Sequence, residues 1–284
     1  MFIWNFVASR VMGQIVDWIY EKIIDFLGDF FGMMGNMGAE LFQYDFVKAI
    51  VELFRLFGWA LFAVGMVVAV FEAAVEYQNG RGSVKDLCLN MIKGFMAVSL
   101  FTVLPIELYK FCITLQVRMT NGMSTLIGGT SVGSAAKLSL SFVTTLSFGV
   151  LIAIFILIMM GYSVIKIFFA NLKRGGILLI MIAVGSLYMF SVVRGYTDGF
   201  IQWCKQVIGL CLTAFLQAVM LIAGLGVMRA NCLLGIGLIL SASEIPRIAG
   251  QFGLDTSTKA NIMSTIYAAQ SAVSITRTVT SAVR

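Results

Sequence analysis

The sequence predicts an all-α protein, a polytopic transmembrane helical bundle, and two observations, the composition and the long apolar runs, support this. Of the 284 residues, 60% are hydrophobic and only 12% are charged, whereas soluble domains carry about 25% charged residues. The apolar residues fall in long runs, and five of these runs match a hydrocarbon core of about 30 Å. The chain has no histidine, which is the commonest general base and metal ligand. This composition excludes intrinsic disorder and disfavours a soluble enzyme.

Residues 1–35 are predicted to form an amphipathic helix with an acidic stripe. Asp17, Glu21, Asp25 and Asp29 are spaced by four residues and therefore share one helix face. Helices that lie on lipid usually carry lysine and arginine on their polar face. The acidic stripe therefore favours a protein partner or a water-filled lumen, and a plain interfacial helix with a solvated face is the alternative.

The predicted transmembrane domain covers residues 36–242. Its five spans are 56–75, 87–109, 138–170, 177–193 and 207–228. The third span would be about 50 Å long as a single helix, so it is expected to tilt or to project from the bilayer. A basic turn, 171–176, is expected between the third and fourth spans. A sixth segment, 232–242, is too short to cross alone and is predicted to be re-entrant or buried.

The C-terminal residues, 243–284, are predicted to form a soluble helical tail, because they are polar and rich in serine and threonine. The short basic loops, which include Lys173 and Arg174, favour the cytoplasmic side, and this orientation places the N-terminus outside the cell. The net charge of +6 comes from scattered lysine and arginine residues. No basic cluster predicts a nucleic-acid site.

Small residues recur on one face of two predicted spans, a pattern that lets helices approach closely. The positions predicted to pack in this way are Gly65, Ala69, Ala73, Gly209, Thr213 and Gly224. Gln217 lies on the same line as the last three residues. It is therefore predicted to hydrogen-bond between helices rather than to bind a transported solute.

Four polar residues at membrane depth are candidates for the bundle interior, where such groups usually face a cavity or another helix. They are Lys93, Glu107, Lys166 and Gln217. Both lysines lie within reach of a span end, so extension of their side chains to the lipid headgroups is the alternative. Glu107 is expected near the outer interface.

The sequence offers no set of residues for catalysis. Gly161-Tyr162-Ser163 superficially matches a membrane serine protease motif, but no histidine is present to activate the serine. A phosphate-binding P-loop is also absent. The five cysteines include no C-x-x-C pair and are interpreted as small hydrophobic residues. We therefore predict no enzymatic activity, no cofactor and no metal site.

The layout resembles the TrbL-type polytopic inner-membrane subunit of conjugative type IV secretion systems, particularly the forms from Gram-positive mobile elements. The shared features are the amphipathic first helix, the five spans, the polar loop before residue 138 and the helical tail. Residues 244–257 (EIPRIAGQFGLDTS) are also similar to the family's post-membrane segment. The family is not enzymatic, so the resemblance implies no catalytic residues.

The resemblance implies a channel or scaffold subunit in the bacterial cytoplasmic membrane, in contact with lipid and assembled in several copies. Its partners would be other secretion-system membrane subunits and the ATPases that supply energy. Contact with translocated single-stranded DNA or relaxase would be transient. The alternative function is an ion or small-solute channel or transporter unrelated to conjugation. That alternative is disfavoured because the spans contain no internal repeat and no deep carboxylate. A holin-like protein is a third interpretation, which the number of spans disfavours.

Overall fold

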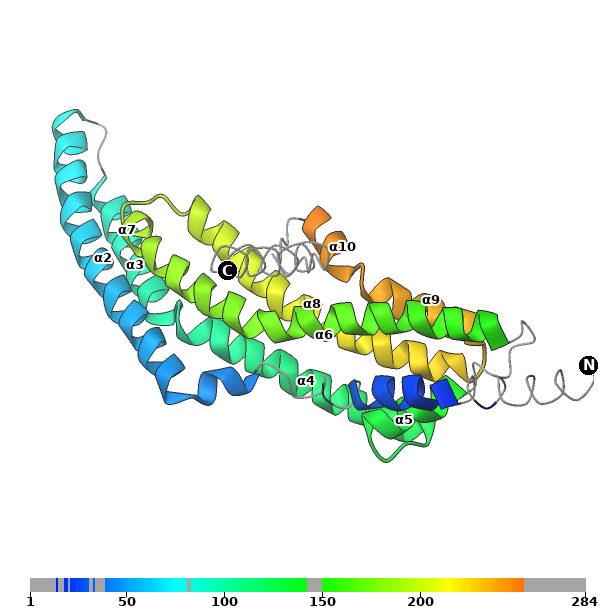
Figure 1. Ribbon diagram of the computed structural model, residues 1–284. Coiled ribbons are helices and arrows are strands. Elements are labelled where there is room, and N and C mark those ends of the chain that lie inside the picture. The colour runs from blue at the N-terminus through cyan, green and yellow to red at the C-terminus, as the bar shows by residue number, and fades with distance from the viewer. Residues whose placement is uncertain are drawn as a thin grey trace, which may run out of the picture.

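The computed structural model describes residues 14, 18, 19, 21–30, 33, 39–80, 83–141 and 150–252, and these residues form helices joined by short connections, without strands. Their elements from residue 39 onward are η1 (Ala39–Gln43), α2 (Asp45–Gln78), α3 (Val84–Leu100), α4 (Val103–Ile127), α5 (Val132–Leu140), α6 (Val150–Leu187), α7 (Met189–Val192), α8 (Asp198–Met228), α9 (Cys232–Ala242) and α10 (Ile245–Gln251). Figure 1 shows an elongated bundle, with the α2–α3 turn at one end and α5 at the other. The prediction of an all-α bundle is confirmed.

Three helical stretches are long and apolar enough to cross a membrane: Asp45–Gln78, Ile154–Val192 and Asp198–Met228. Two bent pairs, α3 with α4 and α9 with α10, raise the number of candidate spans among the described residues to five if each pair is one span. The pairs bend by 50° and 56°. Several apolar helices of this length make the chain a multi-pass membrane protein.

The predicted span 87–109 is broken at Phe101 and Thr102, between α3 and α4. Pro105 explains the break, because proline has no N–H to bond the carbonyl of residue 101 and its ring clashes with that carbonyl. Pro105 lies in the first turn of α4, where the missing donor costs least. The straight span expected from hydropathy is therefore replaced by two helices that meet at 50°.

The turn predicted at 171–176 is wrong, because α6 is continuous through these residues. Gly175 and Gly176 each cost about 1 kcal/mol in a helix interior, but apolar runs flank them on both sides. Arg174 and Asn171 are buried rather than solvated, so they do not mark the end of a span. Of the third predicted span, 138–170, the structure describes the end of α5, which stops at Leu140, and the part of α6 from Val150 onward, and residues 142–149 lie outside the described part of the chain.

Helix α8 organises the interior, since it packs most extensively against α9 and α4. One hydrophobic cluster joins α8 to α5, α6 and α9, and includes Leu157, Ile222 and Ile239. A second cluster joins α8 to α2, α3, α4 and α7, and includes Phe101 and Leu210. The predicted short segment 232–242 coincides with α9 and lies against α8. Most of the predicted domains 1–35 and 243–284 lies outside the described residues, so these two divisions stay predictions.

Candidate functional site

The four predicted interior polar residues lie in different environments. Gln217 is buried in α8, with 1% of its surface exposed. Lys93 and Glu107 are exposed, and Glu107 Oε1 accepts a hydrogen bond from Lys110 Nζ at 2.9 Å. Lys166 is partly buried, with Nζ 3.7 Å from Oε1 of Glu244. Of the four, Gln217 alone is fully enclosed by the bundle.

Arg174 forms the centre of a buried polar cluster that sequence reasoning missed. Its guanidinium donates through Nη1 to Asn171 Oδ1 on α6 and through Nη2 to Gln217 Oε1 on α8. Arg174 has no exposed surface, and Asn171 is 4% exposed. Arg174 also lies near the midpoint of the 39-residue stretch Ile154–Val192. We call Asn171, Arg174 and Gln217 the arginine cluster; it joins two membrane helices through hydrogen bonds to a buried charge.

Helix α4 adds a further line of buried polar side chains in the interior, where it packs against α8. Gln116, Thr120 and Ser124 are spaced by four residues and are all buried, so they share one face of α4. The Ser124 hydroxyl donates to the Thr120 carbonyl at 2.6 Å. Thr213 of α8 similarly donates to the Gly209 carbonyl at 2.8 Å. The bundle interior is therefore polar along α4 and α8 as well as at the arginine cluster.

Two of the predicted small-residue positions, Gly65 and Gly224, lie at close contacts within the chain. A side chain at Gly65 would collide with the Phe190 carbonyl, and one at Gly224 would collide with Ile239 and the Gly235 carbonyl. Ala69 and Gly209 are buried, and Ala73 is partly buried. The close contacts at Gly65 and Gly224 hold α2 against α7 and the residue after it, Val193, and α8 against α9.

The acidic stripe of the first helix meets Lys137 of α5. Lys137 Nζ lies 3.0 Å from Asp25 Oδ1 and 3.4 Å from Asp29 Oδ1. The hydrogen bond to Asp25, with a smaller contribution from Asp29, raises the pKa of Lys137. Glu21 is exposed, and Asp17 lies outside the described residues. Two members of the predicted partner-binding stripe therefore contact their own chain.

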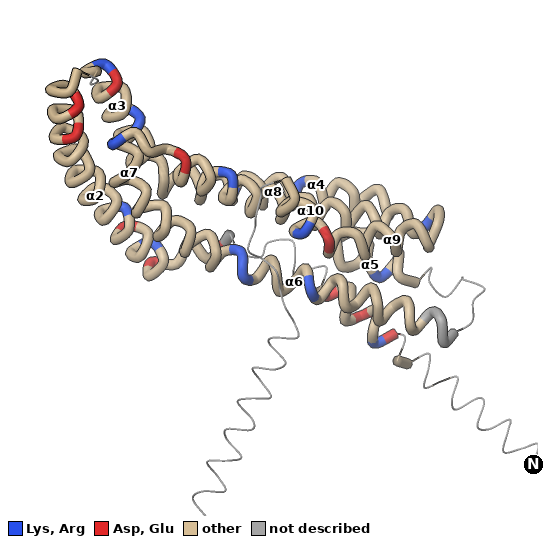
Figure 2. The backbone as a smooth tube through the Cα atoms, turned by 90° about the horizontal axis from the view of Figure 1, so that it is seen from above, with Lys and Arg blue, Asp and Glu red and all other residues tan. Residues whose placement is uncertain are grey.

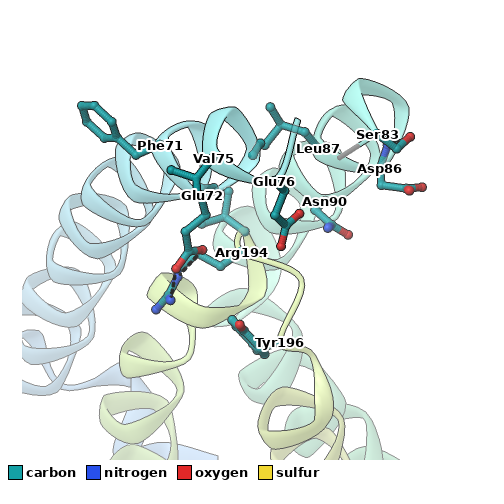
Figure 3. A pocket seen from close by; sticks show the side chains of 13 residues that line it. Phe71, Glu72, Val75, Glu76, Ser83, Asp86, Leu87, Asn90, Arg194 and Tyr196 are labelled. Carbon is teal, nitrogen blue, oxygen red and sulfur yellow. Dashed lines mark hydrogen bonds and ion pairs between the residues drawn. The ribbon is translucent and has the colours of Figure 1, made fainter. Parts of the chain in front are cut away.

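A pocket of about 510 Å³ lies where α2, α3 and the α7–α8 connection meet. Figure 3 shows the Arg194 side chain directed at Glu72, to which its Nε donates at 3.0 Å. The guanidinium also lies over the Phe190 ring, 5.0 Å from its centroid. Glu76 and Asp86 also line the pocket, so three of its four charged side chains are acidic. Figure 2 shows charged residues gathered at this end of the molecule.

The described residues include no group of three or more histidine, cysteine, aspartate or glutamate side chains that could hold a metal ion. The charged side chains of the pocket and of the arginine cluster can bind and position charged groups.

The family model for the conjugal transfer protein TrbL matches residues 1–284. The chain belongs to the TrbL family. No curated protein and no solved structure matches it. The match confirms the resemblance inferred from the layout and makes the chain a component of conjugal transfer.

Membership of the TrbL family explains why the sequence offered motifs for packing rather than for catalysis. The family is a structural component of conjugation. Sequence reasoning missed Arg174 and Asn171 as interior residues. One feature of the sequence could have indicated them: they are three residues apart within the apolar run that starts before residue 154. That spacing places both side chains on one helix face.

Proposed function

We propose that the chain is a channel or scaffold subunit of a conjugative type IV secretion apparatus, which helps to translocate a DNA–protein substrate across the bacterial cytoplasmic membrane. The observation that carries this proposal is the match to the TrbL family over the whole chain. The apolar helices, three of them long enough to span a bilayer singly, support a position within the membrane.

The interior supports a conduit or scaffold role over a solute carrier. Ion-coupled transporters usually place several buried carboxylates around a central site between paired repeats. Here the buried charged side chain among the described residues is a cation, Arg174, held by amide oxygens from two helices.

The outer surface supports assembly with other subunits and with lipid. Helix α2 exposes several large apolar side chains along its length, among them Leu53, Phe57 and Phe71. Such a surface is stable only against lipid or another protein. We propose several copies in the apparatus, an N-terminus outside the cell, contact with other secretion-system membrane subunits and ATPases, and transient contact with single-stranded DNA or relaxase.

The test is deletion and complementation of the gene in a donor strain, combined with purification of the tagged full-length chain in mild detergent. The proposal expects conjugal transfer to fall by several orders of magnitude on deletion and to recover on complementation. It also expects a large assembly that contains a secretion ATPase. Formaldehyde cross-linking during transfer should capture the transferred strand with the tagged chain.

Other outcomes would favour the rival function. A stable monomer or dimer that conducts ions in reconstituted vesicles, in a strain whose transfer survives the deletion, would indicate an ion or small-solute channel. Normal assembly of the apparatus without this chain would exclude the scaffold role. Loss of transfer without any cross-linked DNA would favour a scaffold over a channel.

A further inference from the structure

Helix α4 presents a line of polar side chains on its exposed face, distinct from the buried row of Gln116, Thr120 and Ser124. Its members are all exposed and follow one another every three or four residues: Glu107, Lys110, Thr114, Arg118, Asn121 and Thr125. This spacing keeps them on one side of the helix. We call these residues the α4 stripe. At 1.5 Å per residue it extends about 27 Å along the helix, close to the thickness of a hydrocarbon core of about 30 Å.

The α4 stripe lies at the depth of an apolar helix, because α4 runs beside α8 in the same direction. Cys112 lies next to Cys211, and Ile127 lies next to Gly226. The two pairs have the same separation along the chain, so the helices are parallel and stay in register. Helix α8 is long and apolar enough to cross a membrane on its own. This register places Arg118 near the middle of α8.

Lipid is an unfavourable environment for this face of α4. A charged side chain at membrane depth is costly, and such residues usually pair with one another or face protein or a water-filled cavity. Arg118 is exposed and has no carboxylate partner among the described residues. Asn121 is also exposed, and hydrocarbon would leave its side-chain amide without hydrogen-bond partners. The α4 stripe therefore requires a polar environment outside this chain.

The other members of the stripe are satisfied within α4, which favours water over a complementary protein surface. Lys110 Nζ donates to Glu107 Oε1 at 2.9 Å, and the Thr114 hydroxyl donates to the Lys110 carbonyl at 2.9 Å. The Thr125 hydroxyl donates to the Gly122 carbonyl at 2.7 Å. These groups need no fixed partner on another chain. A second copy of the stripe would oppose it with the same excess of positive charge.

We propose that the α4 stripe lines a water-filled passage through the membrane, where α4 of this chain meets neighbouring subunits of the apparatus. This inference rests on the proposed channel role and assigns it to one face of one helix. Water in the passage hydrates Arg118 and Asn121, while the buried side of α4 stays packed on α8. The exposed apolar residues beside the stripe, Leu115 and Met119, face lipid or a neighbouring subunit.

Cysteine accessibility of the full-length chain in donor-cell membranes tests the proposal. Cys88, Cys204 and Cys232 are replaced by alanine, because they are exposed or partly exposed, whereas the two buried cysteines are kept. Thr114→Cys and Asn121→Cys are then introduced singly, and each is treated with a membrane-impermeant, negatively charged methanethiosulfonate. The reagent attacks a thiolate, which forms in water and not in hydrocarbon, so both should be labelled roughly tenfold faster than the parent chain.

The matched control is Met119→Cys, which lies at the same depth of α4 and is also exposed, but is not part of the stripe. Its labelling should stay at the rate of the parent chain. The adduct at Asn121→Cys narrows the passage, so treated donor cells with this variant should lose conjugal transfer. Treated cells with the parent chain or with Met119→Cys should keep it.

Equal labelling of Thr114→Cys, Asn121→Cys and Met119→Cys would overturn the proposal, because the stripe would then not be a distinct water-exposed face. Labelling that occurs in the purified chain and disappears in the assembled apparatus would also overturn it, since another subunit would cover the stripe. Both results leave the role in transfer intact. If transfer instead survives deletion of the gene, the proposed function fails, and a labelled stripe would still support the passage.

Discussion

Helices α2 and α8 are similar in sequence character and differ in environment. They contain 34 and 31 residues, and their most apolar stretches have nearly the same hydropathy. Yet 22% of that stretch is buried in α2, against 61% in α8. Helix α2 presents apolar side chains outward, whereas α8 buries Thr213 and Gln217. Hydropathy therefore identifies a membrane helix, and its polar residues indicate whether it faces protein or lipid.

The largest effect is expected at Gln217. Gln217→Leu removes the acceptor for Arg174 Nη2, and a hydrogen bond to a buried charge contributes about 1.5–3 kcal/mol. The free energy of unfolding should fall by about 3 kcal/mol, measured by thermal unfolding in detergent. Gln202→Leu, at an exposed position of the same helix, should change it by less than about 0.5 kcal/mol. Equal losses in the two proteins would mean that burial does not distinguish these positions.

A smaller loss in the free energy of unfolding is expected from a change at the contact between α9 and α8. A Cβ at Gly235 would lie 2.6 Å from both the Gly224 carbonyl oxygen and the Met228 backbone nitrogen, so Gly235→Ala must separate two backbones. Overpacking of this kind costs about 1–3 kcal/mol. Gly237 of the same helix has no atom within 4 Å of the corresponding position, and Gly237→Ala should preserve Tm. A Tm that falls equally in both would indicate lost helix flexibility rather than lost packing.

The ion pair at the exposed end of α2 should matter less than either change in the α8 region. Glu72→Gln removes the charge that pairs with Arg194, and because both side chains are partly exposed, water weakens this pair. The expected Tm shift is smaller than that of Gly235→Ala and shrinks further in high salt. A larger and salt-independent shift would show that α2 is more tightly packed than its exposure indicates. Glu76→Gln, in the same pocket, is the control.

The smallest effect on stability is expected at the acidic stripe, although its effect on transfer should be measurable. The double change Asp25→Lys and Asp29→Lys places two positive charges beside Lys137. In the wild-type chain the hydrogen bond to Asp25 raises the pKa of Lys137. A lysine whose pKa is raised in the folded chain stabilises the fold fully at pH values below its pKa in the unfolded chain. This stabilisation is lost only as the pH rises through the pKa of the folded chain, so the contact is intact at neutral pH. The double variant should lower conjugal transfer without removing the protein from the membrane.

A compensating change separates two explanations for that loss. If the stripe acts through its contact with α5, Lys137→Glu should restore transfer to the double variant by restoring opposite charges. If the stripe binds another subunit, transfer stays low in the triple variant. Unchanged transfer in the double variant would exclude both roles.

The sequence predicts helix ends that neighbouring residues determine. It does not predict features that depend on residues far away in the chain. The segment 232–242 was bounded correctly, because Asn231 caps α9 through its side chain and its apolar run is uninterrupted. Pro105 by itself accounts for the break between α3 and α4. Hydropathy does not register this residue and predicts one uninterrupted span. The burial of Arg174 within α6 is accompanied by a hydrogen bond to Gln217, 43 residues away. A local rule assigns the Lys-Arg-Gly-Gly stretch to a turn, because it does not include that partner.

The arginine cluster also fixes an order of events during synthesis. Insertion scales assign an arginine at the centre of a membrane helix about 2.5–3.5 kcal/mol, so α6 enters the bilayer on the strength of its apolar flanks. Gln217 follows Arg174 by 43 residues, which at about 5–20 residues per second is a delay of roughly 2–9 s. During that interval the guanidinium has no acceptor on α8. Helix α6 can therefore complete its packing only after α8 has been made.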